Sequence, residues 1–139
     1  AAKDYKGGIA AGEELIRTDT AFATADVYTR LVAAAAVDSQ PQKAAQLAAM
    51  GVAKFPENGD LLVAYAQALR GAGQTQQAID ALNKAAAANP KIPNLFTTQA
   101  RLYADLGQHD QAMQALQQAL TQGDSAQTVA LYAVGLGQA

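Results

Sequence analysis

Histidine is the side chain best suited to proton transfer near neutral pH, and it is the commonest metal ligand. The chain contains a single histidine, His109, which stands beside Asp110 in a turn that leads into an expected helix. It contains no cysteine, so a thiolate nucleophile and a cysteine-based zinc site are both excluded. We therefore expect no metal site and no cofactor, and we interpret His109 as a solvated turn residue.

The other groups that could support catalysis lack their chemical partners. Ser39 and Ser125 occupy turn positions, and no base is paired with either of them. Gly71–Gly73 resembles a phosphate-binding loop, but it follows no strand and precedes no Lys-Ser/Thr pair. The adjacent carboxylates Glu13–Glu14 lie on a short amphipathic segment with Arg17 one turn further on, which is typical of a solvated face. We expect no catalytic residues, and we expect that the chain is not an enzyme.

Charge and hydropathy exclude two classes of partner. Ten basic and twelve acidic side chains give a formal net charge of -2, and they are scattered along the chain. This distribution provides no cationic surface for nucleic acid or for an anionic membrane. The longest unbroken apolar run, Leu31–Val37, is far shorter than the roughly 20 residues of a membrane-spanning helix. We expect a soluble protein with no nucleic-acid partner and no membrane insertion.

The sequence repeats itself every 34 residues. This step relates three positions in each of several sets, namely Gln40, Gln74 and Gln108; Ala44, Ala78 and Ala112; Tyr28, Leu62 and Phe96; and Ala48, Leu82 and Leu116. It also relates Gly73 to Gly107 and Pro56 to Pro90. Glycine ends helices and proline disfavours helix at the residue before it, so these residues mark the ends of the elements within each unit.

Apolar residues recur at helical spacing between these marks. The pattern predicts eight helices, at about 6–17, 24–37, 42–54, 60–71, 75–88, 94–106, 109–122 and 126–136. No segment alternates with a period of two over a useful length, so we predict no strands. Alanine, the best helix former, supplies 35 of the 139 residues. The fold class expected from the residues alone is all-α.

The joint pattern resembles the tetratricopeptide repeat (TPR) family, whose 34-residue unit is a helix–turn–helix. In the middle unit the family positions are filled by Leu62, Tyr65, Ala66, Leu69, Ala78, Leu82 and Pro90. One unit later Gln99 stands where the family places leucine. The resemblance implies a right-handed superhelix of antiparallel helix pairs that forms one domain over 1–139. Its expected parts are the second helix of an incomplete repeat, or a cap, at 5–22, repeats at 25–58, 59–92 and 93–124, and a capping helix at 125–139.

In proteins of this family the first helices of successive repeats line a concave groove, and the resemblance implies a partner-binding groove here. If the family positions face the core, a second set of residues, spaced three and four residues from one another, faces away from the core and toward the groove. These residues are Asp26, Thr29, Ala33 and Ala36 in the first complete repeat, Asp60, Val63, Gln67 and Arg70 in the second, and Asn94, Thr97, Arg101 and Ala104, with Asp105 beside them, in the third.

These features predict a scaffold that binds a peptide or a partner helix in the groove. Val63, Ala33 and Ala36 would supply apolar contact, and Arg70 and Arg101 would donate hydrogen bonds to an acidic group. One alternative is a structural spacer or self-association module, which is supported by the apolar stripe of Ile9, Leu15 and Ile16 in the first helix. Another alternative is a regulatory domain of a larger enzyme.

The composition also bears on the setting of the protein. Low charge with abundant alanine and glutamine is reminiscent of bacterial envelope, secretion or pilus-assembly repeat proteins, and it favours the periplasm over the cytoplasm. The chain begins with Ala1 rather than methionine and has no signal-peptide pattern, which indicates processing or excision from a longer protein.

Overall fold

In the computed structural model, the described residues are 4–123 together with 126, 129, 130 and 134. They form seven helices and no strand, so the prediction of an all-α chain is confirmed for them. Most of the expected eighth helix at 126–136, and of the cap at 125–139, lies outside the described residues. None of the described helices has the length and apolar character that a membrane crossing requires.

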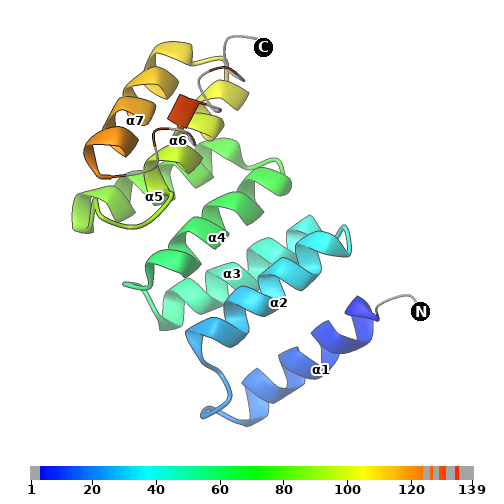
Figure 1. Ribbon diagram of the computed structural model, residues 1–139. Coiled ribbons are helices and arrows are strands. Elements are labelled where there is room, and N and C mark those ends of the chain that lie inside the picture. Colours follow the sequence, from blue (N-terminus) through cyan, green and yellow to red (C-terminus); the bar gives the residue numbers. More distant parts are fainter. Residues whose placement is uncertain (1–3, 124–125, 127–128, 131–133, 135–139) are drawn as a thin grey trace. The chain divides into compact units, whose positions relative to one another are not determined.

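The observed helices begin and end within one residue of the expected positions. They are α1 (Tyr5–Thr18), α2 (Ala25–Val37), α3 (Pro41–Lys54), α4 (Gly59–Gly71), α5 (Thr75–Ala88), α6 (Leu95–Asp105) and α7 (His109–Thr121) (Figure 1). The agreement is this close because periodic apolar residues set the helices and local signals set their ends.

Three of the helices have a side-chain cap at their N-terminus. Asp4, Thr24 and Asn58 precede α1, α2 and α4, and each accepts a hydrogen bond from a backbone N–H in the first turn, at 2.9, 3.4 and 3.0 Å. Pro41 is the first residue of α3, where its missing N–H would have no partner inside the helix.

One turn position recurs in each repeat with a left-handed backbone. Ser39, Gly73 and Gly107 follow α2, α4 and α6 at the 34-residue step, with φ angles of 57°, 81° and 74°. Glycine adopts this conformation without steric cost, whereas a residue with a Cβ atom is strained there. The first repeat therefore keeps the turn of the other two at some conformational cost in Ser39.

Contacts between Cα atoms divide the chain into two compact units, residues 1–73 and 74–139. In the first unit α3 packs against both α2 and α4, α2 also contacts α4, and α1 lies against α2 (Figure 1). The core of this unit includes Ile16, Tyr28, Leu47 and Leu61. Leu61 is fully buried, whereas Leu62, which the family pattern assigns to the core, is only half-buried.

Helix α1 is covered more completely than the sequence indicated. Ile9 and Ile16 are 3% and 7% exposed, because α1 packs on α2, and only Leu15 of the expected stripe is exposed. The apolar stripe that supported self-association is therefore not a surface, and that interpretation was wrong for two of its three residues. Helix α1 therefore packs as other solenoid helices do, with its apolar side against a neighbouring helix.

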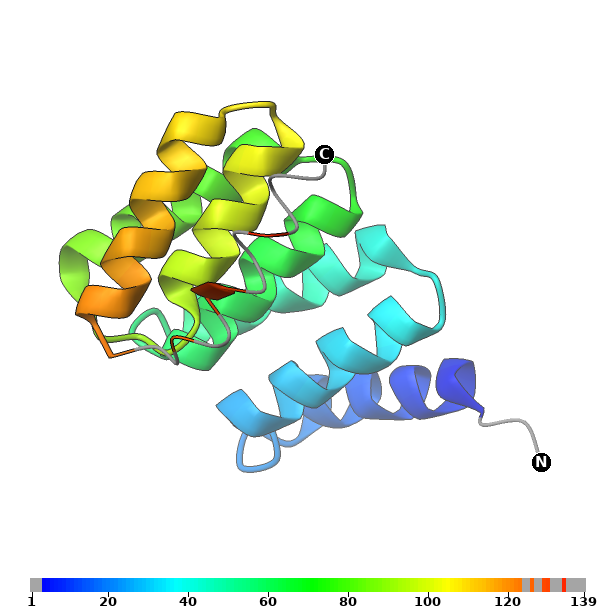
Figure 2. The ribbon, with the colours of Figure 1, turned by 45° about the horizontal axis from the view of Figure 1, so that its top comes forward.

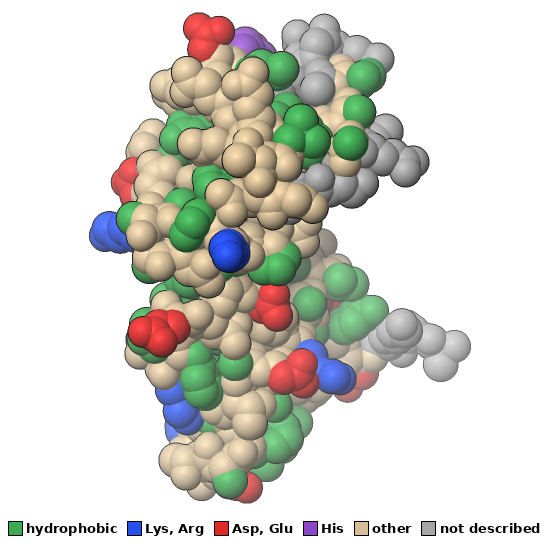
Figure 3. Space-filling model, turned by 60° about the vertical axis from the view of Figure 1, so that its left-hand side comes forward, with side chains coloured by type: hydrophobic (Ala, Val, Ile, Leu, Met, Phe, Trp, Pro, Cys, Tyr) green, Lys and Arg blue, Asp and Glu red, His purple; other side chains and the backbone are tan. Residues whose placement is uncertain are grey.

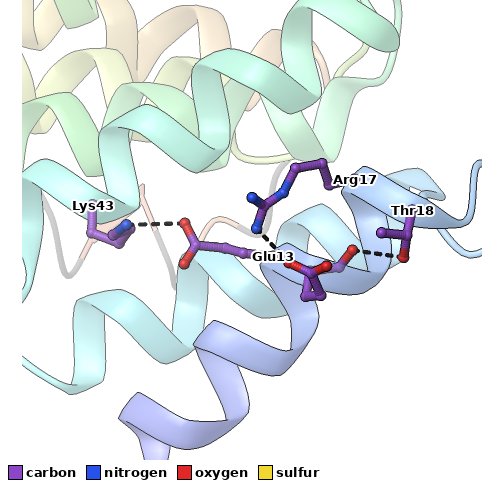
Figure 4. A network of polar contacts seen from close by, with 5 residues as sticks. Glu13, Arg17, Thr18 and Lys43 are labelled. Carbon is purple, nitrogen blue, oxygen red and sulfur yellow. Dashed lines mark hydrogen bonds and ion pairs between the residues drawn. The ribbon is translucent and has the colours of Figure 1, made fainter.

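One ion pair links α1 to α3. Glu13 Oε1 accepts a hydrogen bond from Lys43 Nζ of α3 at 3.0 Å, and both side chains are about one-third exposed (Figure 4). Glu14 instead pairs with Arg17 within α1, at 2.8 Å, where both are largely exposed. Exposed pairs such as Glu14–Arg17 contribute less than about 1 kcal/mol, and of the two pairs only Glu13–Lys43 joins α1 to another helix.

In the second unit α6 packs against both α5 and α7 (Figure 2). Ala78, Ala100 and Ala112 are fully buried, one on each of these helices. Large side chains fill the space around them, with Leu82 and Leu116 also buried. Small residues at the contacts allow the helix backbones to approach closely, which is how a chain with few large side chains still forms a core.

A close contact of α3 with α2 and α4 gives a stability prediction. A methyl group at Gly51 of α3 would lie 3.0 Å from Tyr28 Cβ and 3.0 Å from Leu61 Cδ2, so Gly51→Ala should lower the free energy of unfolding by about 1 to 2 kcal/mol. A methyl group at Gly8 of α1 would have no atom within 4 Å. Gly8→Ala should therefore raise the free energy of unfolding by about 0.5 to 1 kcal/mol. Urea denaturation measures both. Equal effects of the two substitutions would contradict the helix packing described above.

Candidate functional site

A groove opens on the first unit where α2, α3 and α4 meet. It has a volume of about 570 Å³. Its lining, hereafter the groove, consists of Thr29, Val32, Ala33 and Ala36 of α2, Ser39 of the turn, Pro41 and Ala44 of α3, and Ala64, Gln67, Ala68 and Gly71 of α4. The space exists because alanine and glycine occupy the facing sides of two helices, where longer side chains would fill it.

The groove is chemically neutral. None of its lining residues is charged, and its hydrogen-bonding side chains are Thr29, Ser39 and Gln67. Thr29 Oγ1 donates to the Ala25 carbonyl oxygen at 2.9 Å, so its oxygen still accepts from a ligand. Elsewhere the charged side chains are scattered over the face seen in Figure 3, with neutral surface between them. The arrangement suits an uncharged ligand with apolar side chains and a hydrogen-bonding backbone.

Several residues that the sequence assigned to a partner-binding groove meet in this one. Thr29, Ala33 and Ala36 face it from α2, and Gln67 faces it from α4. Asp26 and Asp60 are exposed but lie outside the lining, and Asp26 Oδ2 accepts a hydrogen bond from Arg30 Nε at 2.7 Å.

Two of the expected groove residues are buried. Val63 is 9% exposed and Thr97 is 1% exposed, so neither offers a surface to a partner, and the expectation that they face solvent was wrong. A helix with neighbours on several sides buries more than one face. In α6, which contacts both α5 and α7, seven of the eleven residues are buried. Thr97 tolerates burial because its hydroxyl donates to the Asn94 carbonyl oxygen at 3.0 Å.

The remaining expected residues lie at helix ends or in the second unit. Asn94 has a φ of 63° and precedes α6, so it is not part of a helix face. Arg70 is exposed near the end of α4, Arg101 is half-buried in α6, and all three of Arg70, Arg101 and Asp105 have interaction partners. The expected convergence of Arg70 with Arg101 joins residues of different units and stays a prediction. Ala104 is half-buried.

Metal-binding chemistry is not suggested by the described residues, which contain no group of three or more His, Cys, Asp or Glu side chains able to hold an ion. His109 is exposed at the first position of α7.

Comparison with known proteins decides the family. A family model described as tetratricopeptide repeat matches residues 1–133. The chain belongs to the tetratricopeptide repeat family. Among curated proteins, none matches the sequence significantly.

Solved TPR structures are similar in fold. The chain resembles MamA at 21% identity with a TM-score of 0.74, and the match covers 96% of this chain and 80% of that one. A thermophilic TPR protein of Thermus thermophilus matches at 21% identity and a TM-score of 0.74, over 96% and 75% of the two chains. A TPR protein from Parabacteroides merdae matches at 18% identity and a TM-score of 0.77, over 96% and 52%. The likeness shows an all-α helical solenoid.

Membership of the TPR family gives the general class of function. TPR domains are protein–protein interaction scaffolds, and members of the family are typically not enzymes.

The second compact unit, residues 74–139, contains a cavity that the sequence did not indicate. It has a volume of about 620 Å³ and lies where α5 and α7 both pack on α6. Its lining, hereafter the furrow, consists of Asn83, Ala86, Ala87 and Pro90 from α5 and the turn after it, Phe96, Gln99 and Tyr103 of α6, and Gln111, Gln114, Ala115, Gln118, Thr121 and Gln122 from α7 and its C-cap. Glutamines three and four residues apart on α7 were the sequence signal, but by themselves they are typical of a solvated helix face.

A buried amide lies at the base of the furrow. Gln99 of α6 is 4% exposed, and its Nε2 donates to Asn83 Oδ1 of α5 at 2.8 Å. The family places leucine at this position, and the hydrogen bond to Asn83 explains how an amide is accommodated there. The departure from the family pattern therefore does not break the packing of α5 on α6.

Replacing Gln99 tests whether the amide serves stability. Its partner Asn83 is exposed and can bond to water instead, so Gln99→Leu should leave the free energy of unfolding unchanged or raise it by about 1 kcal/mol. Gln99→Ala should lower it by about 2 kcal/mol, because a cavity remains. Thermal and urea denaturation measure both variants. A large loss of stability in Gln99→Leu would show that the hydrogen bond to Asn83 is structural.

Proposed function

We propose that this TPR protein binds an uncharged segment of a partner protein, as an extended peptide or a helix, in the groove of its first unit. The observation that supports the proposal is the combination of an open cavity of about 570 Å³ with a lining that is small, largely apolar and free of charge. Such a surface gains free energy by covering apolar groups on the partner.

The lining also indicates how the partner is oriented. Ala33, Ala36 and Ala64 provide shallow space for aliphatic side chains, while Thr29 and Gln67 offer hydrogen-bonding groups from facing helices. Alanine contributes no side-chain entropy cost when it is covered, so a partner loses little by binding against it. Affinity then comes from shape and apolar contact, with polar contacts that fix the direction of the chain.

We also propose a role in the bacterial envelope, in secretion or in pilus assembly, with the periplasm as the compartment. The support is compositional, since the chain combines few charges with abundant alanine and glutamine. The identity of a partner captured at the groove tests this role, because a cytoplasmic partner would contradict it.

A charge placed in the groove should abolish binding. Ala33 is exposed and lines the groove, so Ala33→Glu should fold normally but force a carboxylate against an apolar ligand. Peptides selected from a random 12-residue library on the wild-type chain should bind this variant at least about tenfold more weakly in fluorescence anisotropy.

The matched control is Ala53→Glu, at an exposed position of α3 in the same unit and outside the groove. This variant should bind the selected peptides as tightly as the wild type. Binding should also change little between low and high salt, because no lining residue is charged. Equal loss in both variants would contradict the proposal, because the loss would then not depend on the groove. Strong salt dependence would also contradict it, because it would indicate that charged residues outside the groove bind the peptides.

A further inference from the structure

We propose that the furrow of the second unit is a further binding site, which holds an uncharged peptide segment in extended conformation through its backbone. The furrow and the groove share no lining residue and lie on different helices. An experiment can therefore disprove binding at one of the two sites without affecting the proposal for the other. The proposal rests on the spacing of the glutamines of α7, on the chemistry of the amide group and on the floor of the furrow.

Four glutamines form a ladder along one wall of the furrow. Gln111, Gln114, Gln118 and Gln122 all line the furrow and are exposed. Steps of three, four and four residues keep them on one side of the helix, about 4.5 to 6 Å apart along its axis. No hydrogen bond within the described part of the chain uses their side-chain amides. The ladder therefore presents donors and acceptors to a ligand.

The repeat of this ladder is close to that of an extended peptide. Residues in a strand advance about 3.3 Å each, so peptide groups that point to the same side recur about every 6.6 Å. A strand that runs beside α7 would therefore meet Gln114, Gln118 and Gln122 with peptide groups of every second residue. From Gln111 to Gln122 the ladder spans about 16 Å, the length of about five extended residues.

The amide group matches the peptide group chemically. Each glutamine side chain carries a donor and an acceptor, as does each peptide unit, so one amide can bond both to an N–H and to a C=O. A charged ligand would find no opposite charge in the furrow, because none of its lining residues is ionised. The furrow therefore favours a neutral segment recognised through its main chain.

The floor and the opposite wall accept the side chains of such a segment. Phe96 and Ala115, which line the furrow, are buried, and Tyr103, which also lines it, is half-buried. Ala86 and Ala87 of α5 form the far wall with small side chains. Alternate side chains of an extended peptide point to opposite faces, so every second one would face this apolar floor while the others face solvent.

The experiment is a titration of the full ¹⁵N-labelled chain, followed by NMR through the side-chain NH₂ signals of glutamine. The probes are capped, uncharged octapeptides in which alanine, valine or leucine alternates with serine or threonine. We expect the signals of Gln114 and Gln118 to shift on binding. Peptides of the same sequences with N-methyl groups on alternate residues should not bind, because they lack the N–H donors.

Variants localise the effect. Gln114→Ala combined with Gln118→Ala should weaken binding about tenfold through the loss of hydrogen bonds, and it should not impair folding, since alanine favours helix. The matched control is Gln117→Ala, an exposed glutamine of the same helix that does not line the furrow. It should bind as the wild type does.

Four results would overturn the proposal. The first is that no octapeptide shifts the glutamine signals, and the second is that peptides shift only residues of the groove, such as Thr29 and Gln67. The third is that N-methylated peptides bind equally well. The fourth is that a tetrasaccharide of N-acetylglucosamine shifts the ladder while the peptides do not, which would make the furrow a glycan site.

Discussion

The close approach of helix backbones at small residues is the constraint on which the rest of this structure depends. A methyl group at Gly51 of α3 would lie only 3.0 Å from Tyr28 Cβ and from Leu61 Cδ2, and Ala100 and Ala112 are fully buried in the second unit. A chain in which alanine supplies 35 of 139 residues cannot fill wide gaps between helices. It forms a core by bringing the helices together and inserting a few leucines and aromatic rings around the contacts.

The abundance of small side chains also determines the shape of the surface. The groove is open because alanines of α2 and α4 line it and their side chains are too short to fill it. Its lining is neutral because none of these positions carries a charged side chain. Where α5 and α7 both pack on α6, the space between them is bordered by glutamines. Both cavities follow from how the helices pack, and the side chains on their rims determine what each can bind.

The sequence predicts the helices of this fold well because their signals are local. Periodic apolar residues, the turn at Ser39, Gly73 and Gly107, and Pro41 at the start of α3 place every described boundary within one residue. A helical wheel also assigns Thr29 of α2 and Gln67 of α4 to the groove, and both of them line it.

Burial by several neighbours is what the sequence could not supply. Val63 and Thr97 look exposed on a wheel with one buried face, yet both are covered, and Ile9 and Ile16 look exposed only if α1 is left without neighbours. The furrow was missed for a related reason. Glutamines on a second helix look solvated until the positions of α5 and α6 show that they border a cavity.

Photo-crosslinking in the source organism tests the central claim, that a partner occupies the groove, most directly. Benzoylphenylalanine in place of Ala36, which is exposed and lines the groove, should form a covalent adduct with a specific protein on irradiation. The same amino acid in place of Ala53, exposed on α3 outside the groove, should form none. An equal adduct at both positions, or an adduct at Ala53 alone, would contradict the account.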